Sequence, residues 1–201
     1  MSETRKVCYT CYRPHSSCMC KYIKPIETQT RFIILMHPKE FRKTKNGTGH
    51  FTNLSLKNSE IHVGIDFSEH IEINKILANS DNACYVIYPS DNSINLNTSS
   101  ISKEKKNTVL FFIDATWPCS KSMLVQSPNL DVLKKVSFTH TKTSAFNFKK
   151  QPQKYCLSTM ESTLCVLKLL NKQQDEDLDK ESLKNFLLPF HKMVEYQVSC
   201  V

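Results

Sequence analysis

One acidic residue of the chain follows directly on its most apolar segment. Residues 109–113 are all apolar, which predicts a strand buried on both faces of a parallel sheet, and Asp114 comes next. In open α/β sheets, ligands bind just outside the carboxyl ends of the strands. Asp114 could therefore serve as a general base at such a site, or it could simply help to cap the helix that follows.

The residues after Asp114 predict the start of that helix. Thr116 can cap a helix, and Pro118 fits a helix's first turn. Trp117, the only tryptophan of the chain, lies between them. The segment thus has the form of a strand that turns into a helix at the edge of a sheet, where a ligand site is expected.

Four cysteines near the N-terminus have the spacing of a metal site. Cys8 and Cys11 form a Cys-x-x-Cys pair, and Cys18 and Cys20 follow as a Cys-x-Cys pair, with an Arg-Pro turn in between. Two close thiolate pairs suit tetrahedral zinc, and four sulfur ligands leave no open position for catalysis. We predict a structural zinc knuckle, because free thiols would leave the pairing unexplained and no thioredoxin-like unit follows that would support a redox motif.

Two basic segments could contact a polyanion. The first begins at His37, after an apolar run, and contains two of the chain's three glycines, which suggests a tight turn or a close approach to a ligand. Its basic side chains suit phosphate groups, although a charge run is more often a solvated loop; they are Arg42, Lys43, Lys45 and His50. The second, residues 142–154, includes Phe146 and Phe148, which could stack on bases or fill the core.

The length and composition of the chain indicate which partners it could bind and where in the cell it is expected. The chain has 201 residues, enough for one domain with a small appendage. With 27 Lys and Arg against 19 Asp and Glu, its net charge of +8 favours a polyanionic partner, nucleic acid before a membrane surface. No apolar segment is long enough to span a membrane or to form a signal peptide, so we expect a cytoplasmic protein. Three glycines exclude a Gly-rich phosphate loop.

Alternating strands and helices indicate an α/β sheet. We expect strands at residues 31–36, 61–65, 83–88 and 109–113, and an additional one at 136–138. Helices are expected at residues 48–57, 69–78 and 180–201, and from Trp117, Pro128 and Tyr155 onward. Pro189 should kink or split the last helix, Ser158 and Glu161 have the spacing of a capping box, and residues 90–107 should form a long exposed loop.

Five separated segments resemble one family, the DTW-domain proteins, in the same order along the chain. They are Cys8-x-x-Cys11-x-Arg13-Pro14 with Cys18-x-Cys20, His37-Pro38-x-Glu40 with Thr48-Gly49, Asp114-Ala115-Thr116-Trp117, residues 157–161 and residues 187–194. The chain departs from the family twice. Ala115 stands where glycine is common, and Asn46-Gly47-Thr48-Gly49 is one residue longer than the Asn-Thr-Gly of many members.

The resemblance implies a fold and a reaction. The family is similar to SPOUT-class enzymes, which implies an α/β fold with a SPOUT-like knotted, mostly parallel sheet, flanking helices and a small N-terminal zinc knuckle of four cysteines. Residues 1–28 would form the knuckle and residues 29–201 the catalytic DTW domain. Characterised members are tRNA-uridine aminocarboxypropyltransferases. The chain is thus expected to transfer the 3-amino-3-carboxypropyl group of S-adenosylmethionine to N3 of a tRNA uridine, leaving methylthioadenosine.

The resemblance also implies roles for single residues. The catalytic segment would be Asp114, Thr116 and Trp117. From the chemistry we expect Asp114 to be the base, because uridine N3 must lose its proton before it can attack, and Trp117 to be a packing residue beneath the donor. The donor would be bound by Tyr88, Pro89, Ser90, Asp114, Leu157, Ser158, Thr159 and Glu161, of which Glu161 could instead be only a helix cap. The tRNA would be bound by His37, Glu40, Arg42, Lys43, Lys45, His50, Lys149 and Lys150, and zinc by Cys8, Cys11, Cys18 and Cys20. We expect no obligate protein partner.

Two other functions fit the same residues. Most SPOUT-like enzymes move a methyl group, so a tRNA or rRNA methyltransferase is one alternative. A zinc-stabilised RNA-binding module without catalysis is the other. A donor labelled either on the methyl or on the carboxyl carbon would distinguish all three.

Overall fold

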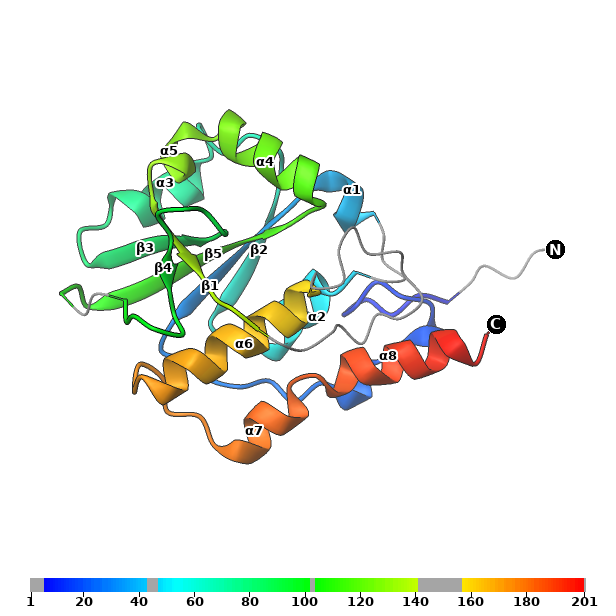
Figure 1. Ribbon diagram of the computed structural model, residues 1–201. Coiled ribbons are helices and arrows are strands. Elements are labelled where there is room, and N and C mark those ends of the chain that lie inside the picture. Colours follow the sequence, from blue (N-terminus) through cyan, green and yellow to red (C-terminus); the bar gives the residue numbers. More distant parts are fainter. Residues whose placement is uncertain (1–5, 43–46, 102–103, 141–156, 201) are drawn as a thin grey trace.

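A parallel sheet of six strands forms the centre of the computed structural model (Figure 1). The structure describes residues 6–42, 47–101, 104–140 and 157–200. The strand order is β2-β1-β5-β3-β6-β4, and every neighbouring pair is parallel. The strands are β1 (Arg31–Met36), β2 (Ser59–Val63), β3 (Asn82–Ile87), β4 (Ile94–Asn95), β5 (Asn107–Asp114) and β6 (Lys134–Ser137). The prediction of an α/β fold with a parallel sheet is confirmed.

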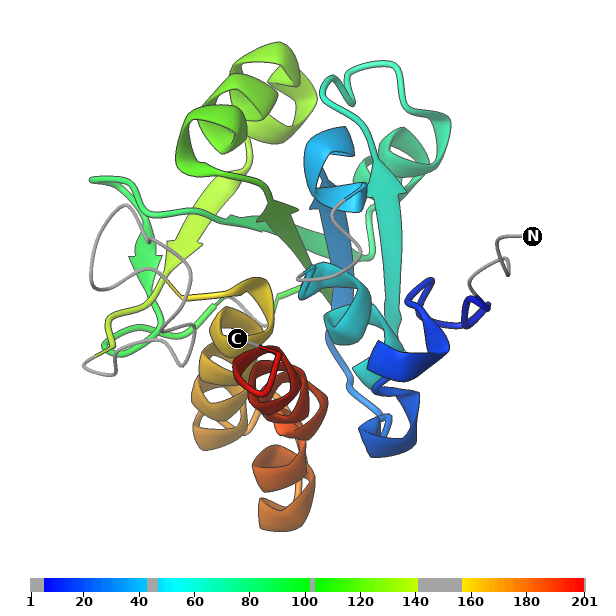
Figure 2. The ribbon, with the colours of Figure 1, turned by 90° about the vertical axis from the view of Figure 1, so that its right-hand side faces the viewer.

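Helices cover both faces of the sheet (Figures 1 and 2). One face carries α3 (Ile71–Ala78), α4 (Trp117–Gln126) and α5 (Pro128–Asp131). The other carries α2 (Gly49–Ser55), α6 (Thr159–Lys172), α7 (Lys180–Asn185) and α8 (Leu188–Val198). The short helix α1 (Pro38–Phe41) follows β1, and two 3-10 helices, η1 (His15–Ser17) and η2 (Cys20–Tyr22), lie in the N-terminal segment. Among the helices of the described ranges, none combines the length and the apolar character that crossing a membrane requires.

The strand before Asp114 is buried on both faces, as its apolar run predicts. Val109 and Phe111 pack into the core beneath α3, α4 and α5, whereas Leu110 and Phe112 pack into the core on the α6 side. Successive side chains of a strand point to opposite faces, so a strand between two helical layers must be apolar at every position. This is why the segment that precedes Asp114 shows no alternation.

The register brings several strand ends to one edge of the sheet. Met36 of β1 pairs with Asp114 of β5, and Ile87 of β3 pairs with Phe112 of β5. The backbone N–H of His37 donates to the carbonyl oxygen of Asp114 at 3.0 Å. Because the strands are parallel, the segments that follow β1, β3 and β5 therefore emerge side by side.

The segment 90–107 differs from its prediction as a long exposed loop. It contains the short strand β4, which pairs with β6, and Leu96 and Ile101 are buried in the core. Two apolar side chains at the right spacing suffice to fold back a chain whose other residues are mainly polar. The prediction rested on the many polar residues of the segment, which are exposed, and overlooked Leu96 and Ile101, which are buried.

The C-terminal helical segment divides as predicted. α7 ends at Asn185 and α8 begins at Leu188, with Pro189 in its first turn, where the missing N–H costs nothing.

A buried carboxylate that the sequence did not suggest connects the segment before α7 to the start of β1. The carboxylate of Glu176, which is 5% exposed, accepts hydrogen bonds from the backbone N–H groups of Gln29 and Thr30 just before β1, at 2.9 and 2.8 Å.

Candidate functional site

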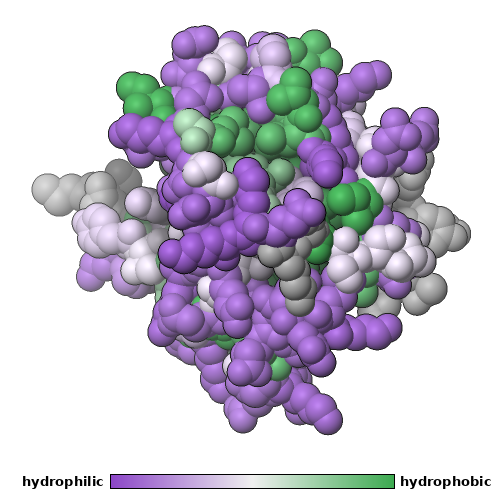
Figure 3. Space-filling view, turned by 90° about the vertical axis from the view of Figure 1, so that its left-hand side faces the viewer, coloured by the Kyte–Doolittle hydropathy of each residue, from purple (hydrophilic) through white to green (hydrophobic). Residues whose placement is uncertain are grey.

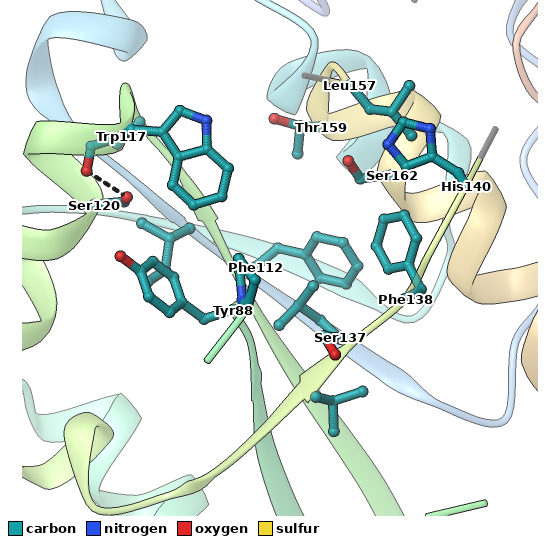
Figure 4. A pocket seen from close by; sticks show the side chains of 15 residues that line it. Tyr88, Phe112, Trp117, Ser120, Ser137, Phe138, His140, Leu157, Thr159 and Ser162 are labelled. Atoms are coloured by element: carbon teal, nitrogen blue, oxygen red, sulfur yellow. Dashed lines mark hydrogen bonds between the residues drawn. The ribbon is translucent and has the colours of Figure 1, made fainter. Parts of the chain in front are cut away.

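A cavity of about 290 Å³ opens where β3, β5 and β6 end (Figure 4). Three chain segments contribute to its wall, one after β3, one after β5 and one at the start of α6. It is lined by Ile87, Tyr88, Pro89, Phe112, Ile113, Ala115, Trp117, Ser120, Val136, Ser137, Phe138, His140, Leu157, Thr159 and Ser162. An apolar wall with a few hydroxyl groups is the usual form of a small-molecule site.

Two aromatic rings form one side of this cavity. Tyr88 and Trp117 meet edge to face, with 5.9 Å between ring centroids and 62° between planes. Figure 4 shows them across the cavity from Leu157, Thr159 and Ser162. Each ring offers an apolar face that a planar ligand could contact, and the Tyr88 phenol adds a polar group that can donate or accept a hydrogen bond.

The expectation that Trp117 packs beneath the site is wrong. Its side chain is 45% exposed, and it lines the cavity. The core-facing side of α4 is formed further along by Ser120, Met123 and Leu124. Trp117 is the first residue of α4, three residues beyond the end of β5, and its ring borders the cavity at this end of the sheet.

Asp114 is held behind the cavity by the start of α6. The hydroxyl of Thr159 donates a hydrogen bond of 2.7 Å to Oδ1 of Asp114. Thr159 lines the cavity, whereas Asp114 is not among the lining residues. Thr116 occupies the position before α4, but its side chain makes no capping hydrogen bond. A ligand in the cavity would therefore meet Asp114 through the Thr159 hydroxyl.

The backbone of Gly49 presses on the other side of the same carboxylate. A Cβ atom built on Gly49 would lie 2.2 Å from Oδ2 of Asp114 and 2.6 Å from Cε of Met36. Real Cβ atoms do not come this close to other atoms, so any side chain at this position would displace the Asp114 carboxylate and the end of the Met36 side chain. Thr159 and Gly49 together define where the Asp114 carboxylate lies.

The remaining residues predicted for the α6 side of the site form a helix cap. The Ser158 N–H donates to Oε2 of Glu161 at 2.9 Å, and the Glu161 N–H donates to the Ser158 hydroxyl at 3.3 Å. This capping box was predicted from the spacing and is confirmed. It orients Thr159, the first residue of α6, while Ser158 and Glu161 lie outside the cavity lining.

Ser90 belongs to a neighbouring groove. This groove has a volume of about 410 Å³, and Tyr88 lines both it and the cavity. Its wall includes Ser90 together with Lys121, Lys135 and the exposed Val125. Apolar residues gather on the upper half of the face in Figure 3, at the height of α4 and α5. The groove thus extends the site along α4 and adds Lys121 and the ion pair of Lys135 with Asp131 to it.

The residues predicted to contact RNA have different environments. His37 is 7% exposed, and its Nδ1 accepts a hydrogen bond of 3.0 Å from the Lys39 N–H, so it caps α1. Glu40 and Arg42 lie on and just after α1, and Arg42 is exposed. His50 lies on α2, where burial, and then the charge of Arg13, lower the pKa of its ring. Lys43, Lys45, Lys149 and Lys150 lie outside the described residues.

The four N-terminal cysteines converge. Their sulfur atoms all lie within 4.8 Å of one another, with 3.8 Å between Cys8 and Cys20 and 3.8 Å between Cys11 and Cys18. Four sulfurs at about 2.3 Å from a tetrahedral zinc are about 3.8 Å apart, so this donor set fits zinc. Backbone N–H groups, that of Cys11 first, lower the pKa of Cys8 to about 6, whereas burial raises the pKa of Cys11 and of Cys20.

Arg13 connects this cluster to the rest of the site, a role that the sequence analysis missed. The side chain is 1% exposed, its guanidinium carbon lies 3.7 Å from the centre of the Phe51 ring, and its Nη2 donates to the Gly47 carbonyl at 3.0 Å. Burial lowers its pKa to about 10, although the nearby Cys11, Cys20 and Cys18 act in the opposite direction. The sequence did contain a signal for this role, because Arg13 lies between the two cysteine pairs, and a cation is attracted to thiolates.

Comparison with known proteins places the chain in a family. The sequence model of the DTW domain matches residues 5–198. A relative from Mus musculus named tRNA-uridine aminocarboxypropyltransferase 2 is 25% identical in an alignment of 174 positions, which covers 85% of this chain and 58% of that protein. A relative of the same name from Drosophila melanogaster is 27% identical in an alignment of 201 positions, which covers 96% of this chain and 76% of that protein.

The chain therefore spans only 58% of the length of the mouse relative that it matches. No solved structure matches the chain significantly. The match to the DTW domain, in contrast, includes the cysteine cluster, Asp114 with Thr116 and Trp117, and the capping box of α6. Because that match extends over almost the whole sequence, the chain belongs to the DTW-domain family.

Proposed function

We propose that the chain is a tRNA-uridine aminocarboxypropyltransferase. It would transfer the 3-amino-3-carboxypropyl group of S-adenosylmethionine to N3 of a tRNA uridine. The observation that carries the proposal is the aromatic cavity at the carboxyl ends of β3, β5 and β6, with the Asp114–Thr159 pair at its wall. Membership of the DTW family and the names of the mouse and fly relatives support the choice of reaction.

The cavity is the proposed donor site. Tyr88, Pro89, Leu157 and Thr159 line it and would contact the donor directly. Ser158 and Glu161 would act through the helix cap that orients Thr159, and Ser90 would contact whatever extends into the neighbouring groove. The donor supplies an electrophilic carbon next to its sulfonium, and the bond between that carbon and sulfur breaks as methylthioadenosine leaves.

The residues of the chain would position the uridine and remove its proton. N3 of uridine becomes a good nucleophile once its proton has left, which requires a base within hydrogen-bonding reach. The Thr159 hydroxyl proton already points to Asp114, so the Thr159 oxygen can accept a hydrogen bond from a group in the cavity. We propose that the N3 proton passes to Thr159 while the Thr159 proton passes to Asp114.

The cysteine cluster would hold one structural zinc. Cys8, Cys11, Cys18 and Cys20 supply four sulfurs, which closes a tetrahedral site and leaves zinc no position for substrate. Zinc would thereby fix the segment that carries Arg13.

The same proposal includes three further features. The sheet would have the knotted SPOUT-like arrangement, the chain would divide into residues 1–28 and 29–201, and the protein would be cytoplasmic.

The tRNA backbone would be bound by basic residues next to α1. Arg42 is exposed there, and Lys43 and Lys45 follow it in the sequence. Lys149 and Lys150 would add contacts from the second basic segment. His37 would contribute as the cap that holds α1, and His50 as a neutral ring beneath it rather than as a phosphate ligand.

Labelled donors test the proposal. The purified chain is incubated with a tRNA transcript and S-adenosylmethionine labelled either on the methyl carbon or on the carboxyl carbon. We expect label in the RNA from the carboxyl position only, together with one methylthioadenosine for each modified uridine. Label from the methyl position would show a methyltransferase, and no label from either would show an RNA-binding module; both results contradict the proposal.

A further inference from the structure

Three rings from separate parts of the chain form a row near α1, in which the two outer rings are exposed and the middle one, His50, is partly buried. The ring of His50, on α2, lies between those of Phe41, on α1, and Tyr12, in the N-terminal segment, with centroid distances of 5.3 and 6.0 Å. Phe41 is 41% exposed and Tyr12 is 55% exposed. Figure 2 shows the dark blue N-terminal segment beside cyan α2 on the same face as α1.

Tyr12 occupies an unusual backbone conformation. Its φ is 57°, in the left-handed region that a bulky residue adopts only at a cost. Hydrogen bonds of 2.8 Å from the Tyr12 N–H to the Cys8 carbonyl and from the Cys8 N–H to the Arg13 carbonyl hold it there. Glycine or asparagine would fit this position with less strain, so the tyrosine ring points to a use beyond folding.

Exposed cations lie close to the row in the sequence, with the acidic Glu40 among them, whereas the row itself is uncharged. Lys39 and Arg42 are exposed on and just after α1, and Lys6 is exposed in the N-terminal segment. His50 is kept neutral near pH 7, since burial and the charge of Arg13 both lower its pKa. Uncharged rings next to cations suit the binding of a nucleic acid strand. Its bases can stack on the aromatic rings, and its phosphates are attracted to the positive charges.

We propose that Tyr12, His50 and Phe41 form a stacking surface for unpaired bases of the RNA substrate. This inference rests on the proposed function, because it takes that substrate to be tRNA. His50 directly follows Gly49, whose backbone presses on the Asp114 carboxylate. A base stacked on the row would thus fix the RNA strand on the Asp114 side of the cavity, close to the uridine that reacts.

Two labelled probes separate base stacking from phosphate binding. One is a fluorescein-labelled octanucleotide of uridine, and the other is an octamer of abasic ribose phosphates with the same charge. Wild-type chain should bind the uridine probe about tenfold or more tightly than the abasic one, the scale of one or two stacked bases. Equal affinity for both probes would overturn the proposal.

Variants then locate the stacking surface. Tyr12→Asn and Phe41→Ala should each weaken binding of the uridine probe about fivefold to tenfold and leave the abasic probe unchanged. Tyr12→Phe, which keeps the ring, and Ile71→Ala, which removes an exposed apolar side chain from α3, should bind like the wild type. Wild-type affinity in both Tyr12→Asn and Phe41→Ala would contradict the assignment.

A purely structural role for Tyr12 predicts something different. Asparagine tolerates the left-handed backbone, so Tyr12→Asn should keep its zinc content and melting temperature while its RNA affinity falls. If stability and affinity fall together, and Tyr12→Phe fails to restore either, the ring is a packing residue and the proposal is wrong.

The same variants separate this proposal from the proposed function. With carboxyl-labelled donor, Tyr12→Asn should raise the KM for tRNA and leave kcat near the wild-type value. If the wild type transfers no label but the probe results hold, the proposed reaction is wrong and the stacking surface remains. If transfer proceeds and the KM for tRNA is unchanged in both ring variants, the reaction stands and the stacking surface falls.

Discussion

At the scale of single residues, the position of one carboxylate decides what the site can do. Asp114 ends the central strand, but Thr159 stands between it and the cavity. A base that acts through a hydroxyl needs both groups in line, so the two residues should be sensitive to different changes. Asp114 should require its charge, and Thr159 should require only its hydroxyl.

Asp114→Asn should therefore keep the fold and the zinc content while turnover falls about a hundredfold or more, the usual effect of losing a general base. Thr159→Ser keeps the hydroxyl and should stay within a few-fold of wild type, whereas Thr159→Val should resemble Asp114→Asn. Single-turnover assays at saturating tRNA and donor measure these rates. Near wild-type turnover in Asp114→Asn would reduce this carboxylate to a structural partner of Thr159.

Gly49→Ala tests the other contact of the same carboxylate. The new methyl group would overlap with Oδ2 of Asp114, which must then move, and overpacking of this kind typically costs about 1–3 kcal/mol. We expect lower stability in chemical denaturation and lower turnover. Gly64→Ala is the matched control, since its Cβ would meet Phe67 ring atoms at 3.1 Å rather than the site. Equal effects of the two changes would show that Gly49 has no special relation to Asp114.

Trp117→Ala should affect binding more than stability. The ring keeps 45% of its surface exposed, so the free energy of unfolding should fall by about 1–2 kcal/mol, less than for an aromatic ring in the core. Donor affinity, measured by calorimetry, should fall because the edge-to-face partner of Tyr88 is lost. Phe112→Ala provides the contrast, because that ring is 3% exposed and its loss should cost about 3–5 kcal/mol. A large stability loss in Trp117→Ala would restore the packing role.

At the scale of elements, the N-terminal segment and α2 act as one unit. Arg13 lies on the Phe51 ring of α2 and donates to the Gly47 carbonyl just before that helix. Cys11 and Met19 belong to the same buried core as Phe51. A change that loosens the cysteine cluster should therefore also shift the start of α2. Gly49, the first residue of that helix, lies against the Asp114 carboxylate.

Metal analysis tests this coupling. We expect about one zinc per chain in protein purified without chelator, because four thiolates close a tetrahedral site. Cys18→Ser should lose the metal and lower the melting temperature before it lowers donor affinity. Cys200→Ser, at an exposed cysteine outside the cluster, should change none of the three. Protein free of zinc with wild-type stability would contradict a structural metal.

At the scale of the whole molecule, charge sets the partner. The net charge of +8 gives the chain a general attraction for polyanions, and exposed Arg42 adds a local one beside α1. Each phosphate that a lysine or arginine neutralises releases counterions, so affinity for tRNA should fall steeply as salt rises.

Arg42→Ala should lower the slope of log affinity against log salt by about one and leave donor binding unchanged. Lys75→Ala, on α3, is the control, since this exposed lysine already pairs with Glu72 at 2.9 Å. Filter binding between low and high salt provides the measurement. An affinity for tRNA that does not change with salt would show that the basic surface is only solvated.

The sequence by itself determined the features that depend on neighbours along the chain. The apolar run before Asp114 determined a strand buried on both faces, the capping box determined the start of α6, and the spacing of four cysteines determined their convergence. These patterns follow from the periods of strands, from helix ends and from metal geometry, all of which act over a few residues.

The tertiary structure alone decided how distant residues meet. Asp114 and Thr159 are 45 positions apart, and Arg13 and Gly47 are 34 apart, so no local pattern reports either contact. The exposure of Trp117 depends on where the sheet ends beneath α4, and the burial of Arg13 depends on α2 packing against the knuckle. Such contacts arise from the packing of whole elements, which is why the residues of the site could be named from the sequence but their relations could not.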